Sequence, residues 1–405
     1  MPNKTLTFIL AGGMGSRLAP LTAERAKPAV PFGGKYRIID FALTNCLHSG
    51  MHRILVLTQY KSHSLQKHLR DGWSIFNPEL GQFVTTVPAQ MRKDSRWYLG
   101  TADAIHQNLY LLERSDAEHV LILSGDHIYR MDYAAMLDSH RQSGAGISLA
   151  CMEVALGEAH NFGIIEIDAH NRVVDFVEKP AHPAPTPGNG ACAMASMGIY
   201  IFSRERLIDC LNQDHDIPDS DHDFGHDILP RLIQSLHVHA YRFGESEGRV
   251  SQDRYWRDAG TLDSFFEANM DLLNPLPSLD LYQSDWPIRT YQAQTPPART
   301  VPGRSGTEGV FINSILGGGS VISGAAISHS VLFPGVTVSD ESLIQNSILF
   351  HGVSVGEHVQ IQNAIIDKHV HVPAGEEIGI DLAKDRQRFS VSDKGVVVVP
   401  KGYRF

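Results

Sequence analysis

The chain has 405 residues, more than one ordinary hydrophobic core accommodates, so two or three domains are expected. Apolar residues make up 42% and charged residues 20%, which is typical of a soluble globular protein. The formal charge of −10 argues against a nucleic-acid partner, because phosphate backbones need clustered cations. No apolar run reaches the roughly 18 residues of a membrane-spanning helix, so no membrane contact is expected. The four cysteines form no C-x-x-C pair and predict reduced thiols in a cytoplasm.

A glycine-rich turn near the N-terminus is the first candidate binding site. An apolar run, Leu6 to Leu10, reads as a buried strand, and three glycines follow within residues 12–15. A strand that breaks into such a turn aims several backbone N–H groups at one point, which favours phosphate. Arg17 ends the turn with a charged fork suited to phosphate oxygens. The turn therefore predicts a polyanionic ligand such as a nucleotide, with an ordinary tight turn as the alternative.

Two familiar phosphate-binding motifs do not fit this turn. The dinucleotide fingerprint needs a third glycine where Leu18 stands, and the P-loop needs Ser or Thr where Tyr36 follows Gly34 and Lys35.

Strand-like and helix-like stretches then alternate through the first half of the chain. The expected elements are a helix from Ile38 to Leu47 with Gly50 as its stop, a strand from Arg53 to Thr58, a helix from Ser62 to Leu69 capped by Ser62, and strands from Val120 to Leu123 and Ile147 to Val154. This alternation predicts a mostly parallel sheet covered on both faces. Ligands of such sheets lie at the carboxyl ends of strands, where the glycine turn and Asp126 both fall.

The middle of the chain is less regular. Residues 164–168 and 173–177 flank a turn and predict a β-hairpin, and residues 181–192 read as a loop. The stretch 286–306 contains four prolines and reads as a linker over the surface.

A six-residue apolar period dominates the rest of the chain. It runs through Ile315, Val321, Ile327 and Phe333, then Leu343, Leu349, Val355 and Ile361, then Ile366, Val372 and Ile378. This period fits neither a helix nor a lone strand and predicts a β-helix built from hexapeptide repeats.

Residues 10–18 and 27–41 together resemble the start of the bacterial glucose-1-phosphate adenylyltransferases, also called ADP-glucose pyrophosphorylases. The resemblance covers nearly the whole chain. It implies an α/β, Rossmann-like nucleotidyltransferase domain over residues 1–285, a linker over 286–306 and a left-handed β-helix domain over 307–405. It also implies a cytoplasmic, allosteric homotetramer that uses Mg²⁺. The implied activity converts ATP and glucose 1-phosphate to ADP-glucose and pyrophosphate for glycogen synthesis.

The resemblance also implies the site residues. The catalytic residues are Arg17, Lys27 and Asp126, and the Mg²⁺ ligands are Asp126 and Asp258. The nucleotide-binding residues are Leu10, Ala11, Gly12, Gly13, Gly15, Gln90 and Gly100. The glucose-1-phosphate-binding residues are Tyr98, Gly163, Glu178, Lys179 and Ser196, and the residues that relay regulation are Gln59 and Trp97. The residues alone also permit ordinary structural roles for some of these side chains. Either aspartate could be a helix cap, and Lys179 could be a surface lysine that Pro180 keeps extended.

Three other patterns imitate different chemistry. Residues 223–225, Asp-Phe-Gly, match the kinase metal motif, but the chain lacks the H-R-D catalytic loop. His222, Asp223, His226 and Asp227 resemble a metal cluster, yet the acids suit the start of a helix that continues through Ile233. Histidines at 329, 351, 369 and 371 could suggest an acyltransferase, and solvated loop histidines are favoured instead.

The resemblance leaves regulation and substrate choice open. Glu24 stands where relatives that respond to fructose 1,6-bisphosphate have a lysine, Pro31 replaces a histidine, and residues 360–363 carry no cation. These departures predict weak or absent activation by that compound. The competing functions are a sugar nucleotidyltransferase that uses UTP or dTTP, and a non-catalytic regulatory subunit of the same fold.

Overall fold

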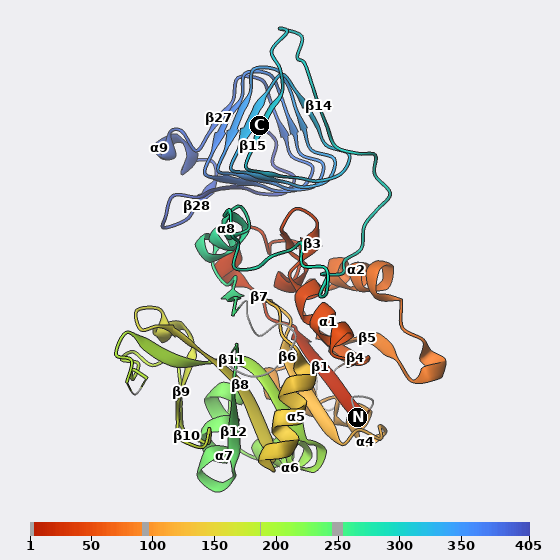
Figure 1. The fold of residues 1–405 in the computed structure, drawn as a ribbon, viewed down its shortest axis with the longest axis vertical. Helices are drawn as coiled ribbons and strands as arrows, with labels where there is room; N and C mark the ends of the chain where they lie inside the picture. The colour runs from red at the N-terminus through yellow and green to blue at the C-terminus, as the bar shows by residue number, and fades with distance from the viewer. Residues whose placement is uncertain (1–3, 91–96, 187, 245–253) are drawn as a thin grey trace.

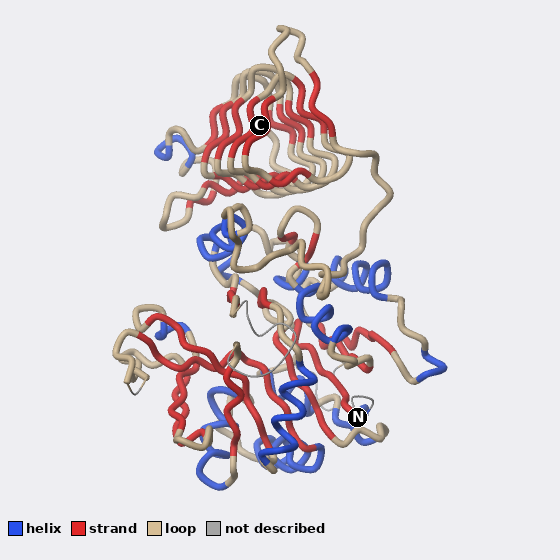
Figure 2. Tube along the Cα trace, in the orientation of Figure 1, coloured by secondary structure: helices blue, strands red, loops and turns tan. Residues whose placement is uncertain are grey.

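The computed structural model describes residues 4–90, 97–186, 188–244 and 254–405. An α/β domain forms one end of the molecule and a β-helix the other, with the strands of the β-helix stacked in flat layers (Figures 1 and 2). Within those ranges, none of the helices has the length and apolar character needed to cross a membrane.

A nine-stranded mixed sheet is the core of the α/β domain. Its order is β10-β9-β11-β6-β1-β4-β5, and β8 pairs with both β11 and β12. The strands are β1 (Thr5–Ala11), β4 (Arg53–Thr58), β5 (Phe83–Pro88), β6 (His119–Ser124), β8 (Ile147–Ala155), β9 (Gly163–Ile167), β10 (Val173–Glu178), β11 (Cys192–Ser203) and β12 (Val238–Arg242).

The predicted fold class is confirmed, and the sheet has a parallel half and an antiparallel half. Strands β6, β1, β4 and β5 run parallel, as the alternation of strands and helices predicts. Strand β11 runs antiparallel to β6, β8 and β9, and the predicted hairpin is β9–β10. The parallel half carries the glycine turn, because parallel strands end at a common edge.

Helices cover both faces of this sheet. They are α1 (Ile39–His48), α2 (His63–Trp73), α3 (Thr101–His106), α4 (Leu109–Glu113), α5 (Tyr133–Ser143), α6 (Arg204–His215) and α7 (Leu229–Ser235). Helix α8 (Leu262–Asp271) packs instead in the cluster that faces the β-helix. Alternate residues of β1 enter opposite cores: Leu6 and Phe8 join the core under α3, α4 and α6, whereas Ile9 and Ala11 join the core under α1, α2 and α5. This alternation follows from the two-residue period of a strand.

The local predictions for the first two helices had different outcomes. Gly50 follows α1 with φ +72° and its N–H bonds to Leu47 O, so its role as a stop is confirmed. The predicted cap by Ser62 is wrong. Ser62 has helical backbone angles and its hydroxyl accepts from Gln66 Nε2 at 3.1 Å instead of capping a backbone N–H.

A small two-stranded sheet crosses the top of the domain. Strands β7 (His127–Tyr129) and β13 (Trp256–Asp258) run antiparallel, and His127 pairs with Asp258. This pairing brings Asp258 next to Asp126, although 132 positions separate them in the sequence.

Three sheets of short strands wrap the C-terminal domain into a parallel β-helix. The first sheet holds β14 (Arg299–Val301), β17 (Val321–Ser323), β20 (Thr337–Val338), β23 (Ser354–Val355) and β26 (His371–Val372). The second sheet holds β15 (Val310–Ile312), β18 (Ala326–Ser328), β21 (Leu343–Gln345), β24 (Gln360–Gln362) and β27 (Glu377–Ile378). The third sheet holds β16 (Ile315–Leu316), β19 (Val331–Leu332), β22 (Ile348–Leu349), β25 (Ala364–Ile366), β29 (Val397–Val399) and β28 (Ser390–Val391). Among the described strand pairs of this C-terminal domain, only β28 and β29 run antiparallel. A short helix, α9 (Leu382–Asp385), follows β27.

The predicted register of the repeat is partly wrong. Ile327, Leu349 and Ile361 are buried as expected, but Leu343 is 43% exposed and its neighbour Ile344 is fully buried. One coil spans 16 or 17 residues, because Ile315 pairs with Val331 and Val331 with Ile348. Since this length is not a multiple of six, the inward position shifts along the chain.

The two domains share an apolar interface. Phe32 of β2 (Pro31–Phe32) and Phe265 of α8 belong to the same buried cluster as Val331 and Phe350 of the β-helix. A second short strand, β3 (Tyr36–Arg37), pairs with β2. At this interface Arg25 Nη2 donates to both carboxylate oxygens of Asp367 at 2.9 Å.

The proline-rich stretch contacts both domains. Trp286 is fully buried and its Nε1 donates to Asn45 Oδ1 on α1 at 3.1 Å. Farther along, β14 pairs with β17 of the β-helix. The domain limits at residues 285, 306 and 307 stay predictions.

Candidate active site

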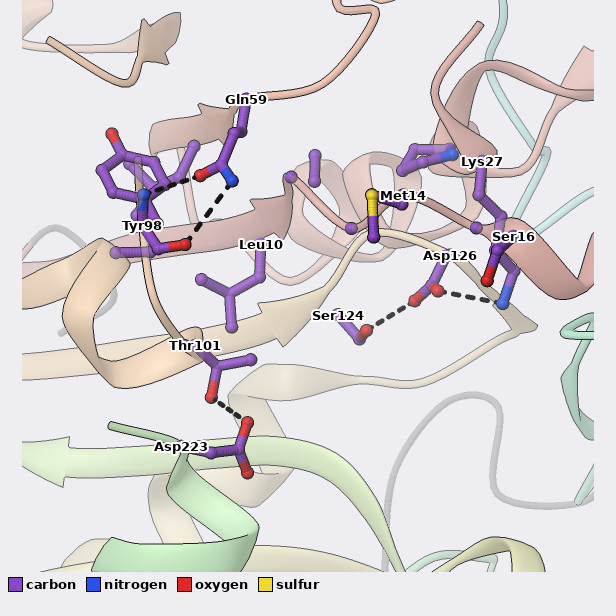
Figure 3. A pocket seen from close by; sticks show the side chains of 18 of the residues that line it. Leu10, Met14, Ser16, Lys27, Gln59, Tyr98, Thr101, Ser124, Asp126 and Asp223 are labelled. Carbon is purple, nitrogen blue, oxygen red and sulfur yellow. Dashed lines mark hydrogen bonds and ion pairs between the residues drawn. The ribbon is translucent and has the colours of Figure 1, made fainter. Parts of the chain in front are cut away.

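A cavity of about 590 Å³ lies at the carboxyl ends of β1 and β6 (Figure 3). Many of the predicted residues line it, namely Leu10, Ala11, Gly12, Gly13, Gly15, Arg17, Lys27, Gln59, Tyr98, Gly100 and Asp126. The glycine turn and Asp126 thus meet at one edge of the sheet, as expected from its parallel strands.

The glycines of the turn have different physical roles. Gly15 has φ +61°, and a Cβ there would lie 3.0 Å from Lys27 Cβ and 3.1 Å from Thr22 Cγ2. Thr22 Oγ1 also donates to Gly15 O at 2.9 Å. Gly13, in contrast, has open space around its Cα, so a ligand can approach the backbone there.

Lys27 lies between the two aspartates of the site. Its Nζ is 2.9 Å from Asp126 Oδ2 and 2.7 Å from Asp258 Oδ1, and the residue is only 5% exposed. Burial works against the charged ammonium, but the two carboxylates outweigh it and raise the pKa of Lys27. This lysine therefore stays a cation at the floor of the cavity.

Asp126 is held ionised by its neighbours. Ser124 Oγ donates to Asp126 Oδ1 at 2.5 Å (Figure 3). Burial alone would raise the pKa of Asp126, but Lys27 and His127 outweigh it and hold the pKa below its usual range. The helix-cap reading is wrong for this residue, because β7 follows it.

The helix-cap reading is also wrong for Asp258. Helix α8 begins with a capping box in which Thr261 Oγ1 accepts from Ser264 N at 3.2 Å. The carboxylate of Asp258 instead forms an ion pair with Lys27.

Arg17 stands between two cavities. It lines the large cavity and also a second one of about 310 Å³ that Asp258 lines. Its Nη2 is 3.2 Å from where a Cβ at Gly260 would be, so the glycine leaves room for the guanidinium. Among the residues that the structure describes, Arg17 has no hydrogen-bond or ion-pair partner, so the guanidinium is available to an anion.

The predicted sugar-phosphate residues form a group beside the large cavity. Gly163 pairs with Glu178 between β9 and β10, and a Cβ at Gly163 would lie 2.8 Å from Glu178 Oε2. A Cβ at Gly225 would lie 2.7 Å from the same oxygen and 3.4 Å from Asp223 Oδ1. Because Asp223 lines the cavity, Glu178 is next to its wall.

The other two residues of that group differ in exposure. Ser196 of β11 is buried. Lys179 is exposed and contacts Glu178, and its backbone has φ +46°, so the prediction of an extended backbone at Lys179 is wrong. The backbone bond from Lys179 N to Phe162 O holds this turn against the hairpin.

Gln59 and Tyr98 bind each other at the mouth of the cavity (Figure 3). Tyr98 N donates to Gln59 Oε1 at 3.0 Å, and the hydroxyl of Tyr98 accepts from Asn108 Nδ2 at 2.9 Å. Trp97 is 50% exposed next to them. Gln90 is exposed and is not among the residues that line the cavity.

The sequence reasoning did not assign several residues of the cavity wall. Thr101 and Asp223 are hydrogen-bonded to each other at 2.8 Å, and both face the cavity. The Asp-Phe-Gly resemblance was a signal for Asp223, although for the wrong chemistry. The predicted helix start is confirmed, because Asp223 Oδ1 accepts from Gly225 N and His226 N before a helical segment, Phe224–Ile228, that leads into α7.

Comparisons with known proteins agree with this geometry. The nucleotidyl transferase family matches residues 6–275, and the GlmU-like C-terminal hexapeptide family matches residues 296–399. Glucose-1-phosphate adenylyltransferase 2 of Vibrio parahaemolyticus is 60% identical over 400 residues, which are 99% of both chains. The enzyme of the same name from Vibrio vulnificus YJ016 is 62% identical over 400 residues, again 99% of both chains. The glucose-1-phosphate adenylyltransferase of Yersinia pseudotuberculosis IP 31758 is 49% identical over 99% of this chain and 94% of its own.

The chain belongs to the glucose-1-phosphate adenylyltransferase family. The adenylyltransferase is thus a nucleotidyltransferase, and the resemblance noted in residues 10–18 and 27–41 is confirmed.

Proposed function

We propose that this adenylyltransferase joins ATP and glucose 1-phosphate in the 590 Å³ cavity, giving ADP-glucose for glycogen synthesis and pyrophosphate. The observation that supports the site most strongly is that one cavity gathers the glycine turn, Arg17, Lys27 and Asp126. Backbone N–H groups and fixed cations are what two phosphorylated substrates require.

The chemistry needs charge neutralisation more than a protein base. A phosphate oxygen of glucose 1-phosphate forms a bond to the α-phosphorus of ATP, and the bond to the pyrophosphate oxygen breaks. The attacking oxygen is already ionised, so positioning and charge supply most of the rate. Lys27 and Arg17 would neutralise the transferring and leaving phosphates. Tyr98, Gly163, Glu178, Lys179 and Ser196 would hold the sugar phosphate.

The two carboxylates suit a magnesium ion. Asp126 and Asp258 converge on one cation, the Lys27 ammonium; Asp126 lines the large cavity and Asp258 lines the second one. Two carboxylates completed by phosphate oxygens and water are a usual Mg²⁺ ligand set. Within the described ranges no group of three or more His, Cys, Asp and Glu residues could hold a metal, so a protein-only cage is not offered there. Bound Mg²⁺ would add positive charge at the phosphate oxygens.

The catalytic roles are tested by replacing the central lysine. We expect Lys27→Ala to lower turnover with ATP and glucose 1-phosphate by about 10²–10³-fold, because a preorganised charge is lost. Lys35→Ala is the matched control, since Lys35 stacks on Tyr36 and does not line the cavity. Steady-state formation of ADP-glucose measures both, and near-normal turnover in Lys27→Ala contradicts the assignment.

The same assay with UTP and dTTP tests the competing nucleotide choice. Faster product formation with either than with ATP contradicts the adenylyl assignment.

We also propose an assembly and a location for this enzyme. The four cysteines are free thiols, which fits a reducing cytoplasm. A homotetramer rests on family membership, and light scattering should give about four times the 44.7 kDa of one chain. A mass of one or two chains contradicts it.

A further inference from the structure

A short loop, residues 220–225, lies between the nucleotide side and the sugar-phosphate side of the cavity. It follows α6 and includes the first two residues of the helical segment Phe224–Ile228 before α7. Within it, Asp223 lines the cavity and Gly225 lies against the carboxylate of Glu178. The loop is therefore placed to position residues on both sides of the cavity.

On its outer side the loop is fixed by one buried carboxylate. Asp214, near the end of α6, has a side chain that is only 3% exposed. It accepts hydrogen bonds from Ser220 Oγ and His222 Nδ1, both at 2.8 Å, and also binds Arg231. Two of these three partners belong to the loop, so Asp214 fixes its position.

The backbone of His222 is in a region that residues with a side chain rarely adopt. Its φ is +54°, in the left-handed range. Such a conformation persists only where its surroundings hold it. The hydrogen bond from His222 Nδ1 to Asp214 is one such restraint.

On its inner side the loop supports residues 100–103 at the start of α3, which we call the nucleotide wall because Gly100 is one of the predicted nucleotide-binding residues. His222 O accepts from Ala102 N at 2.8 Å and from Asp103 N at 3.3 Å, at the start of α3. A Cβ at Gly100 would lie only 2.3 Å from His222 O, so this wall is in direct contact with the loop.

One residue further along, the loop makes two more bonds to the same wall. Thr101 Oγ1 donates to Asp223 Oδ2 at 2.8 Å (Figure 3), and Phe224 N donates to Thr101 Oγ1 at 3.0 Å. A displacement of His222 would therefore move the start of α3.

We propose that Asp214 and His222 are a positioning pair that holds loop 220–225, and through it aligns the nucleotide wall with the sugar-phosphate residues. Neither residue lines the large cavity, so they act through Thr101 on one side and through Gly225 and Glu178 on the other. The proposal rests on the proposed function of the cavity. The proposal predicts that loosening this loop raises the KM of both substrates together.

The test compares two replacements of His222 in the full-length enzyme with ATP and glucose 1-phosphate. His222→Ala removes the donor to Asp214 and is expected to raise the KM of both substrates about tenfold. His222→Asn offers an amide N–H to Asp214 and tolerates left-handed backbone, so it should keep both KM values within about twofold of wild type. A merely structural role would lower the amount of folded enzyme and leave both KM values unchanged.

Two further variants keep the outcome interpretable. Asp209→Asn, on an exposed position of α6, is the matched control and should leave both KM values unchanged. If His222→Ala does not fold, His222→Gly replaces it, because glycine adopts φ +54° freely and its KM values report the lost hydrogen bond.

The results separate the two proposals. Unchanged KM values in a folded His222→Ala or His222→Gly enzyme overturn the positioning pair, and so does a rise for one substrate alone. Failure of His222→Asn to restore both KM values also overturns it. An inactive wild type would instead count against the function proposed for the cavity.

Discussion

Gly15 shows at the scale of one residue how the glycine turn and the catalytic lysine depend on each other. Its φ of +61° suits glycine, and the space beside its Cα is filled by Thr22 and Lys27. The turn and the lysine therefore form one packed unit.

Replacing this glycine should disturb that unit. We expect Gly15→Ala to destabilise the protein by roughly 1–2 kcal/mol, because alanine is strained in left-handed backbone. The new Cβ would also displace Lys27, so turnover should fall. Gly13→Ala is the control for stability, since a Cβ there meets nothing within 4 Å. Equal unfolding free energies of the two variants in urea would contradict this account.

A buried histidine predicts acid sensitivity far from the cavity. His140 of α5 donates to or accepts from Ser148 at 2.8 Å, and His119, His239 and Arg141 lie near it. Burial and these neighbours lower the pKa of His140 to about 4. The unfolded chain binds this proton near the ordinary pKa of 6.5, so folding stability is lost as pH falls from 6.5 towards 4.

The slope of this loss is measurable. One histidine contributes up to about 1.4 kcal/mol per pH unit in that window. His140→Gln removes the titrating group, so urea unfolding between pH 4 and 6.5 should show a shallower dependence on pH. A variant with the wild-type slope would contradict the contribution of His140.

At the scale of an element, the β-helix strand β21 tests the corrected register of the repeat. Ile344 is fully buried between the coils, whereas Leu343 is 43% exposed on the outer face. We expect Ile344→Ala to cost about 2–5 kcal/mol, because it opens a cavity. Leu343→Ala should cost less than about 0.5 kcal/mol. Unfolding free energies that are equal, or in the reverse order, would contradict the register.

At the scale of the whole molecule, two cations at the domain interface already have carboxylate partners. Arg25 is bound by Asp367, and Glu24 forms an ion pair with Lys401 of the β-helix domain. Lys401 lowers the pKa of Glu24 by hydrogen bonding and charge, so this carboxylate stays ionised at neutral pH.

An anion arriving beside Glu24 would therefore meet the negative charge of its carboxylate. We expect fructose 1,6-bisphosphate to change the initial rate by less than about twofold, because charges repel at contact distance. Titrating the compound against the rate of ADP-glucose formation checks this. Activation of tenfold or more would contradict it, and Glu24→Lys is the variant in which the repulsion is reversed.

Local patterns determined much of this protein. The glycine turn, the strand–helix alternation and the six-residue period are encoded within short windows, so the two folds and the phosphate-binding edge followed from the sequence. The resemblance of residues 10–18 and 27–41 added the site residues, and many of them line one cavity.

Only the tertiary structure decided how distant residues meet. The pairing of β7 with β13 brings Asp258 to Lys27, and the loop after α6 brings Asp223 to Thr101. The register of the β-helix and the left-handed backbone of Lys179 were also decided there. The physical reason is that these features depend on contacts between segments far apart in the chain, which no local pattern of residues contains.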